Sequence, residues 1–340
     1  YIRTSIIISN LISAGGNVTD ELSVEISKDL SPTYIKFLYN SWKMAGKNLS
    51  IFWPIALSKG YELFDLAKDV YNECKINVDI SDLLNWCYPK KPDATDTAEY
   101  LKMAEFILNA NPGLINQSDS NGETPLHKSV EKGSLPHVKL MIALGANIEA
   151  RNDLGNTPIW LACAKKYPCI VEELLDNGAD VNAINLKGNP PLYTTCQSGP
   201  LKIAEMLLIR GANAEIMNNN KDTLILIATR NGQSEILEVL LRYVRKEFVE
   251  YIAPIDGFNA VFASVEANKP DCIDVLYRHG LKYNQHTAKD NIILADSTPL
   301  HLAAYYNRIE AAQKLIEIGV EIDPISGNDL QDMTPLQIAT

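Results

Sequence analysis

One short phrase recurs along this chain of 340 residues. It reads GETPLH from Gly122, and it returns as GNTPIW from Gly155, GNPPLY from Gly188 and DSTPLH from Asp296. The first three copies are separated by steps of 33 residues. A fixed step of this size is typical of a repeat protein, in which each unit contacts only its neighbours.

Each unit has the pattern of two short helices. In the first regular unit, Thr124 can cap a helix and Pro125 occupies its first turn, where a missing N–H costs nothing. Gly133 ends this helix, a second apolar segment covers 138–144, and Gly145 follows it. Neither helix can bury its apolar side alone, so the pattern predicts an all-α stack of helix pairs.

These residues resemble the ankyrin repeat family. GETPLH and the segment LLDNGADVN, Leu174–Asn182, are similar to the signature of that family. The resemblance is regular from Asp119 to Met217 and weaker elsewhere. It implies an ankyrin-repeat solenoid of stacked helix-turn-helix units with hairpin fingers between them.

The chain is expected to have three parts. Residues 1–48 are an irregular helical region or a degenerate repeat, with a helix from about Pro32. Residues 49–118 hold two degenerate ankyrin-like repeats, and 119–340 hold about six repeats. Tyr1 would then lie inside one repeat, and Thr340 would cut off the last one.

Extra residues interrupt the period in the later repeats. They cluster near 243–256, 282–295 and 324–331. In ankyrin proteins such insertions lengthen the fingers. Binding residues often lie in loops of this kind.

Charge and hydropathy exclude several classes of protein. Acidic residues outnumber basic ones by 42 to 31, for a net charge of −11, which disfavours nonspecific nucleic-acid binding. No apolar run reaches the roughly 18 residues of a membrane span, and the start does not resemble a signal peptide. Cys163 and Cys196, at equivalent positions, are expected to be reduced core residues in an intracellular protein.

No catalytic constellation is evident. The resemblance implies that His127 and His301 make structural hydrogen bonds near the turn, and His279 suits a helix C-terminus. Cys163 and Cys169 have no histidine nearby that would complete a zinc site. We therefore expect no enzyme activity, no cofactor and no metal.

One modification site is suggested by the resemblance. Asn182 lies eight residues after Leu174 in a pattern similar to substrates of asparaginyl hydroxylases. The alternative is that Asn182 is a structural hairpin residue, modified or not.

Apolar side chains at or near the fingers are candidates for partner contacts, because finger residues are free from core packing and are otherwise expected to be polar. Some of them could instead pack along the row of fingers. The candidate partner-binding residues are Leu154, Ile184, Leu186, Met217, Ile255, Phe258, Leu294, Tyr305 and Tyr306.

Several other side chains have structural interpretations. Trp160, Tyr193 and Phe262 replace the histidine of the TPLH phrase and are expected to be partly buried. The pair Lys165–Lys166 is expected to be solvated.

The pattern favours a scaffold that binds a partner protein through the concave face and fingers of the array. Richness in Ile, Asn and Lys resembles secreted effectors of intracellular bacteria, in which case the partner is a host protein and the chain acts in the host cytoplasm. We expect a monomer with no nucleic-acid partner and no membrane insertion. The alternative is a targeting or substrate-docking part of a larger effector enzyme whose catalytic domain lies outside this chain.

Overall fold

The protein divides into two compact units, 1–147 and 148–340. The computed structural model describes residues 31–44, 52, 56, 63–74, 97–254, 257–283, 297–322 and 333–339.

The described part of unit 1 is helical. The first described helix begins at Pro32, as the sequence predicts. The described helices are α3 (Pro32–Met44), α5 (Phe64–Cys74), α7 (Thr97–Ala110), the 3₁₀ helix η2 (Pro112–Asn116), α8 (Pro125–Glu131) and α9 (Leu135–Ala143).

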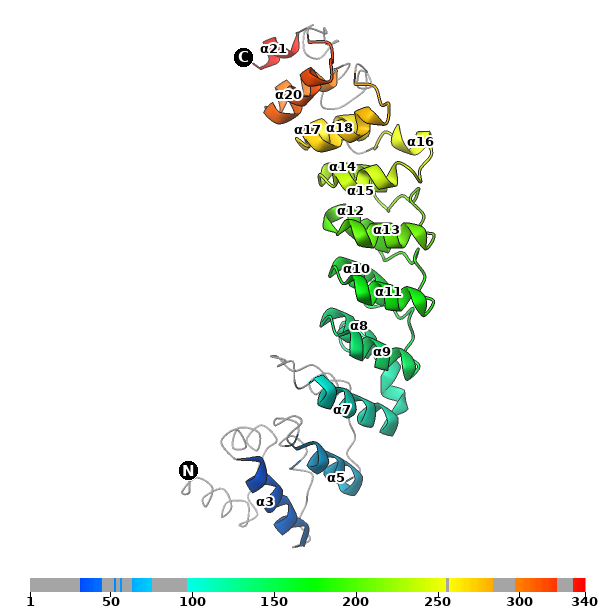
Figure 1. The fold of residues 1–340 in the computed structure, drawn as a ribbon, viewed down its shortest axis with the longest axis vertical. Coiled ribbons are helices and arrows are strands. Elements are labelled where there is room, and N and C mark those ends of the chain that lie inside the picture. The colour runs from blue at the N-terminus through cyan, green and yellow to red at the C-terminus, as the bar shows by residue number, and fades with distance from the viewer. Residues whose placement is uncertain are drawn as a thin grey trace. The chain divides into compact units, whose positions relative to one another are not determined.

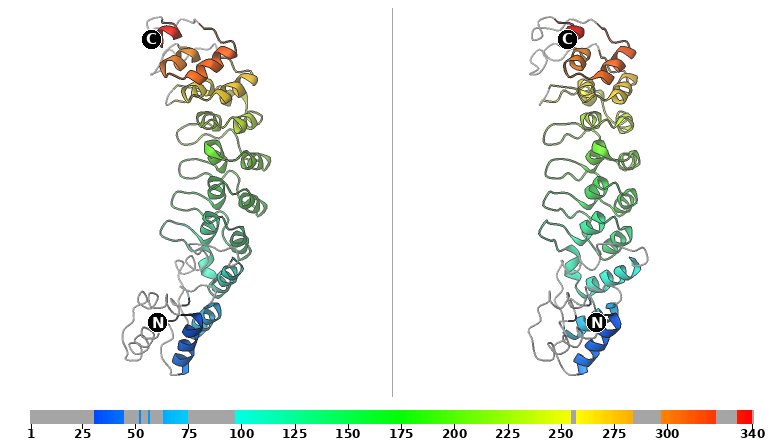
Figure 2. Two further views of the ribbon diagram at one scale, coloured as in Figure 1. Left: turned by 60° about the vertical axis from the view of Figure 1, so that its left-hand side comes forward. Right: turned by 90° about the vertical axis from the view of Figure 1, so that its left-hand side faces the viewer.

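Unit 2 is a stack of helix pairs. Figure 1 shows the pairs one above another, and Figure 2 shows the connecting loops on one side of them. The helices are α10 (Pro158–Ala164), α11 (Pro168–Asp176), α12 (Pro191–Ser198), α13 (Leu201–Ile209), α14 (Leu224–Arg230), α15 (Ser234–Leu240), α16 (Lys246–Val249), α17 (Ala260–Glu266), α18 (Pro270–Arg278), α19 (Pro299–Tyr305), α20 (Ile309–Glu317) and α21 (Pro335–Ile338).

The helices of unit 2 pack in two rows. The first helices of the pairs contact one another in the order α10, α12, α14, α17, α19 and α21, and the second helices in the order α11, α13, α15, α18 and α20. In the described part of the chain the sole β feature is a bridge between Met217 and Thr223. The all-α solenoid prediction is confirmed. None of the described helices has both the length and the apolar character needed to cross a bilayer.

The core repeats with the sequence period. The residue after the helix-starting proline is Ile159 in α10 and Leu192 in α12, and Ile225 takes the same position in α14; all three are almost fully buried. Leu174, Leu207 and Leu240 do the same in the second helices. Burial of such a side chain stabilises by roughly 1.5–3 kcal/mol, so each interface between repeats is held by several equivalent contacts.

The ends of the second helices use glycine. Gly178 follows α11 with φ of 88°. The N–H of Gly178 donates to the carbonyl of Leu175 at 3.1 Å, and that of Ala179 to Leu174 at 3.0 Å. This Schellman geometry satisfies the last carbonyls of the helix and turns the chain towards the next finger.

The regular period ends after the finger at 216–223. The insertion near 243–256 folds in part into the short helix α16 instead of simply lengthening a hairpin. Its end is anchored because Ala253 is buried against Leu226 and Ala263. The insertions expected at 282–295 and 324–331 lie almost entirely outside the described residues.

Candidate protein-binding surface

In each regular finger, the side chain of one Asn or Asp accepts two backbone hydrogen bonds that hold the turn. The Oδ1 atom of Asn185 accepts hydrogen bonds from the N–H groups of Lys187 at 3.0 Å and Asn189 at 3.1 Å. Such a side chain replaces the backbone bonds that a tight turn cannot make. The equivalent residues Asp119, Asn152 and Asn218 make the same pair of bonds.

Adjacent finger tips of unit 2 are joined by hydrogen bonds. The N–H of Leu186 donates to the carbonyl of Leu154 at 3.1 Å, and the N–H of Asn219 donates to that of Lys187 at 3.1 Å. The Arg151 guanidinium also reaches the carbonyl of Ile184 at 2.6 Å. The tips are therefore held in a fixed row before any partner arrives.

Glycine makes this close approach possible. A Cβ at Gly155 would lie 2.8 Å from the backbone nitrogen of Leu186, and one at Gly188 would lie 2.6 Å from Oδ1 of Asn219. Both glycines also have φ near 75° (73° and 75°), a conformation that other residues adopt at a cost.

The candidate leucines lie at the tips of these fingers. Leu154 is 63% exposed and Leu186 is 70% exposed. Ile184 is also exposed, whereas Met217 is half-buried beside its bridge to Thr223. Leu154, Ile184 and Leu186 thus form an apolar strip on fixed backbone, called the tip strip below.

One candidate is wrong and two cannot be placed. Phe258 is fully buried and its ring stacks on Phe262 at 5.8 Å, because the chain after the insertion enters the core at this point. Phe258 is therefore a packing residue and not a partner contact. Ile255 and Leu294 lie outside the described residues.

The tyrosine pair lies at the end of a first helix. Tyr305 is 51% exposed, and its ring meets that of Tyr306 edge-on at 5.1 Å. The Arg308 guanidinium lies 5.7 Å from the centre of the Tyr306 ring. Tyr306 is thus packed by its neighbours, and Tyr305 presents most of the free surface.

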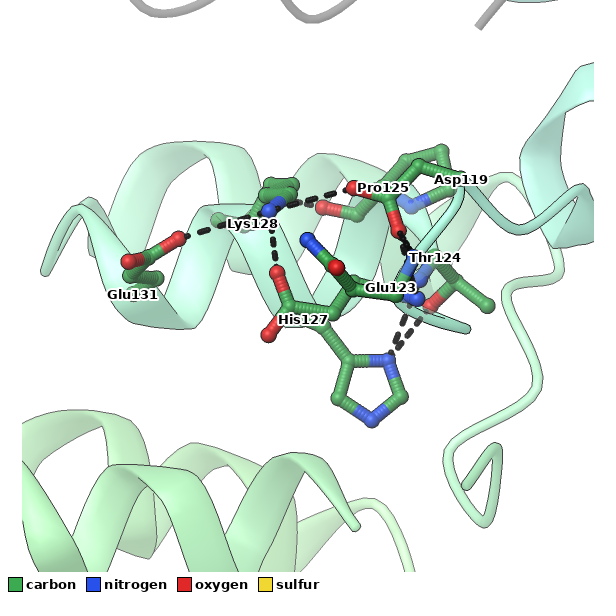
Figure 3. A network of polar contacts seen from close by, with 9 residues as sticks. Asp119, Glu123, Thr124, Pro125, His127, Lys128 and Glu131 are labelled. Atoms are coloured by element: carbon green, nitrogen blue, oxygen red, sulfur yellow. Dashed lines mark hydrogen bonds and ion pairs between the residues drawn. The ribbon is translucent and has the colours of Figure 1, made fainter. Parts of the chain in front are cut away.

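The two TPLH histidines have structural roles, as predicted. Nδ1 of His127 accepts from the Thr124 N–H at 3.2 Å and lies 2.9 Å from its hydroxyl (Figure 3). In the same way Nδ1 of His301 accepts from the N–H of Thr298 at 3.1 Å. Its Nε2 atom lies 3.0 Å from the carbonyl of Met333, so it joins its own repeat to the next.

Trp160 and Tyr193 lie where those histidines lie, and both are half-buried. Phe262, at the same position, is buried, so only the first two contribute surface. The Thr157 hydroxyl and the Trp160 indole N–H are buried without a hydrogen-bond partner in the described part of the chain. The first helices of unit 2 therefore present aromatic surface next to the fingers.

An ion cluster fixes the first regular repeat. Figure 3 shows the Lys128 ammonium among Asp119, Glu123 and Glu131. Burial alone would lower the pKa of Lys128, but hydrogen bonds to Glu123 and Asp119 raise it overall. Glu123 and Asp119 thus favour the charged form of the Lys128 ammonium group, and Glu131 lies 3.6 Å from it.

Asn182 belongs to a ladder that links successive repeats. Its amide donates to the carbonyl of Gly211 at 3.2 Å, and its Oδ1 accepts from the N–H of Asn213 at 2.7 Å. Glu149 and Glu215 accept from the equivalent N–H groups of Asp180 and Arg245 at 2.8 and 2.7 Å. This supports a structural role for Asn182, and its hydroxylation stays a prediction.

Cys163, Cys196 and His279 are explained by packing and helix capping. Cys163 and Cys196 are free and buried, and burial raises the pKa of the Cys196 thiol to about 12. His279 caps the end of α18 and is exposed. Among the described residues no cluster of His, Cys, Asp or Glu could hold a metal ion.

The sequence interpretation expected Lys165 and Lys166 to be solvated and did not consider Lys187 and Lys221. Lys165, Lys166, Lys187 and Lys221 are all exposed on the finger side or at the ends of the first helices of unit 2. The signal was present, because Lys221 follows Gly122, Gly155 and Gly188 in the 33-residue step. Glycine suits this left-handed position best, so the lysine at 221 is not explained by the turn and its side chain is a candidate for a functional role.

Comparison with known proteins agrees with this geometry. A family model described as ankyrin repeats in three copies matches residues 94–185 and 192–287, and a single ankyrin repeat matches 296–327. The human ASB11 ankyrin repeat domain is similar in structure, with a TM-score of 0.54 and 26% identity over 64% of this chain and 92% of that one. The Bcl-3 ankyrin repeat domain shares the fold at a TM-score of 0.53 and 24% identity, over 65% of this chain and 96% of that one.

Three relatives match short segments. Human B-cell lymphoma 3 protein is 34% identical over 20% of this chain, and Monkeypox virus ankyrin repeat protein OPG189 is 42% identical over 19%. Human protein phosphatase 1 regulatory subunit 27 is 42% identical over 15%. The matched segments span 16%, 11% and 32% of those relatives. With family models matched over more than half of its length, this chain belongs to the ankyrin repeat family.

Proposed function

We propose that this chain is a binding scaffold, without catalysis of its own, that holds a partner protein against its fingers and first helices. The observation that carries the proposal is the tip strip. Leu154 and Leu186 are 63% and 70% exposed on consecutive fingers that are hydrogen-bonded to each other. Neighbouring apolar side chains exposed together on a folded surface mark a site of protein interaction.

The energetics suit a specific but modest contact. Burial of each leucine contributes roughly 1.5–3 kcal/mol. The finger row is already ordered by backbone hydrogen bonds, so little conformational entropy is lost when a partner binds. Half-buried Trp160 and Tyr193 lie on the adjacent first helices and extend this surface.

The direct test is capture of the partner from extract of the source cells by the full chain. Leu154→Asp combined with Leu186→Asp is expected to abolish capture, because two carboxylates would have to be desolvated against the partner. Ile209→Asp is the matched control, since Ile209 is 76% exposed on the second helix α13. Loss of capture by the control alone, with helicity retained in both variants, would move the binding site to the second helices.

The tyrosine pair is a second, separable contact. Replacement of Tyr305 by Ala is expected to weaken capture while the fold is retained, because half of this side chain is exposed. Replacement of Tyr306 is expected to lower the thermal midpoint, since its ring packs on Tyr305 and Arg308. Equal effects of the two variants on stability would contradict this division.

The expectations about localisation, oligomeric state, a host partner and a larger enzyme rest on the composition of the chain and on the fraction of each relative that it matches. We propose an intracellular monomer whose partner is a host protein. The alternative is a docking part of a larger enzyme, since the matched segments cover only 16%, 11% and 32% of the relatives' own lengths and leave the rest of such a protein open. Sedimentation of the purified chain tests the first proposal, and the neighbouring coding sequence tests the second.

A further inference from the structure

A further inference concerns the chemistry of the partner, and it rests on the proposed function. Lys187 and Lys221 lie on the fingers and Lys165 and Lys166 follow the end of α10; these four lysines are called the basic border. All four are exposed. None of their ammonium groups makes an ion pair with the described part of the chain.

Several other basic side chains of unit 2 are paired, although Lys202, Lys269 and Lys282 also make no ion pair among the described residues. Arg210 lies 2.6 Å from Asp176, and Arg245 lies 2.8 Å from Glu215. Arg278 lies 3.3 Å from Glu238 on the neighbouring second helix. These three arginines thus have acidic partners within unit 2, and the lysines of the basic border have none among the described residues.

Two of these lysines hold a backbone conformation that favours glycine. Lys166 and Lys221 both have φ of 64°. Gly133 and Gly232 take the position of Lys166 in other repeats, and Gly155 and Gly188 take that of Lys221. A strained residue at a position where glycine would serve the fold better points to a function of its side chain.

The charges divide unit 2 into two unlike sides. The finger tips at 153–155, 186–188 and 219–221 contain one acidic residue, Asp153. Asp222, next to the last of these tips, forms an ion pair with Arg230 at 2.8 Å. The second helices carry the opposite sign. Their acidic residues include Glu172, Glu173, Asp176, Glu205, Glu235, Glu238, Asp271 and Asp274.

We propose that the surface formed by the tip strip and the basic border binds an acidic segment of a partner protein that also carries apolar side chains. Leu154 and Leu186 take the apolar side chains, and the four lysines take the carboxylates. The chain as a whole has a net charge of −11, so this surface is a local reversal of its charge. Complementary charge of this kind speeds encounter and selects the partner.

A nucleic acid fits the same surface less well. Phosphate recognition needs many basic contacts, and a chain of this net charge repels a polyanion over most of its surface. The exposed leucines of the tip strip also have no counterpart on a phosphate backbone. Tight binding of nucleic acid at this surface would therefore contradict the proposal.

The test is selection of displayed random peptides on the full chain. Enriched peptides are expected to combine Asp or Glu with Leu, Ile or Phe, and to bind less tightly as salt is added. Lys187→Glu with Lys221→Glu is expected to weaken them at least roughly fivefold, as two exposed ion pairs allow. Lys202→Glu with Lys139→Glu, at exposed positions on the second helices α13 and α9, is the control and should change binding little.

The outcomes separate this inference from the proposed function. Peptides without acidic residues that still require Leu154 and Leu186 would overturn the inference and leave the scaffold proposal standing. Peptides that ignore the fingers altogether, or no enrichment, would overturn both. Tighter binding of single-stranded DNA than of any acidic peptide, lost in Lys187→Glu with Lys221→Glu, would overturn the protein partner.

A second variant separates a structural role of the lysines from a binding role. Lys166→Gly with Lys221→Gly relieves the left-handed conformation at both positions and removes two positive charges. It is expected to raise the thermal midpoint while it weakens the acidic peptides. A lower midpoint together with unchanged peptide binding would show that these lysines serve the fold alone.

Discussion

At the residue scale, one position decides how each first helix begins. The third residue of the helix is His127 in α8 and His301 in α19, and each histidine bonds to the threonine before its helix. In α10 the same position holds Trp160, and Thr157 has no side-chain partner in the described chain. The same threonine thus contributes differently in different repeats.

Alanine substitution measures that difference. Thr124→Ala is expected to lower the free energy of unfolding by about 1 kcal/mol, because the bond to His127 is lost. Thr157→Ala is expected to cost less than about 0.5 kcal/mol, since there is no such bond to lose. Urea unfolding of both variants gives the comparison, and equal losses would argue against the histidine bond as the source.

Backbone conformation at the tips gives a second contrast. Lys221→Gly is expected to stabilise by about 0.5–1 kcal/mol, the relief of a φ of 64° less the added chain entropy of glycine. Gly188→Ala is expected to destabilise by more than about 1 kcal/mol, because its Cβ would lie 2.6 Å from Oδ1 of Asn219. Thermal unfolding checks both signs. A destabilised Lys221→Gly variant would show that the lysine makes contacts that support the finger.

At the element scale, α9 contains a buried base. His137 is almost fully buried, and its Nδ1 lies 2.7 Å from the Ser134 hydroxyl. Burial lowers the pKa of His137 from 6.5 to about 4, so the folded state holds the neutral ring. The unfolded chain binds the proton first as pH falls. Stability is therefore complete above about pH 6.5 and decreases towards pH 4.

This pH dependence can be measured directly. Between pH 7 and pH 5 the wild-type chain is expected to lose about 2 kcal/mol through this residue. His137→Gln is expected to remove that part of the loss, because Gln does not titrate. Urea unfolding of both proteins at the two pH values isolates the difference. Parallel losses in the two proteins would contradict the assignment.

Burial at equivalent positions of the repeats can be predicted from the sequence where the period is regular, and not where it is interrupted. The 33-residue step places Ile159, Leu192 and Ile225 in the core, because identical positions in stacked units face identical neighbours. It also places Leu154 and Leu186 on exposed tips. It fails at Phe258, which follows the insertion, since a local pattern cannot tell where an irregular connection returns to the core.

At the scale of the whole molecule, the described repeats of unit 2 support one another in sequence. The ladder formed by Glu149, Asn182 and Glu215 joins each exit turn to the next, and the helices pack in two rows. The described part of unit 2 is therefore a row of repeats in which each repeat contacts its neighbours. We propose that its function depends on the tip strip and the basic border, which are among the residues that the rows leave exposed.

The measurement that tests this most directly is hydrogen exchange of the full chain, free and bound to its captured partner or to a selected acidic peptide. Added protection is expected at the fingers 152–156, 185–189 and 218–222 and in α10 and α12. Added protection confined to the second helices α11, α13, α15 and α18, with the fingers unchanged, would contradict this expectation.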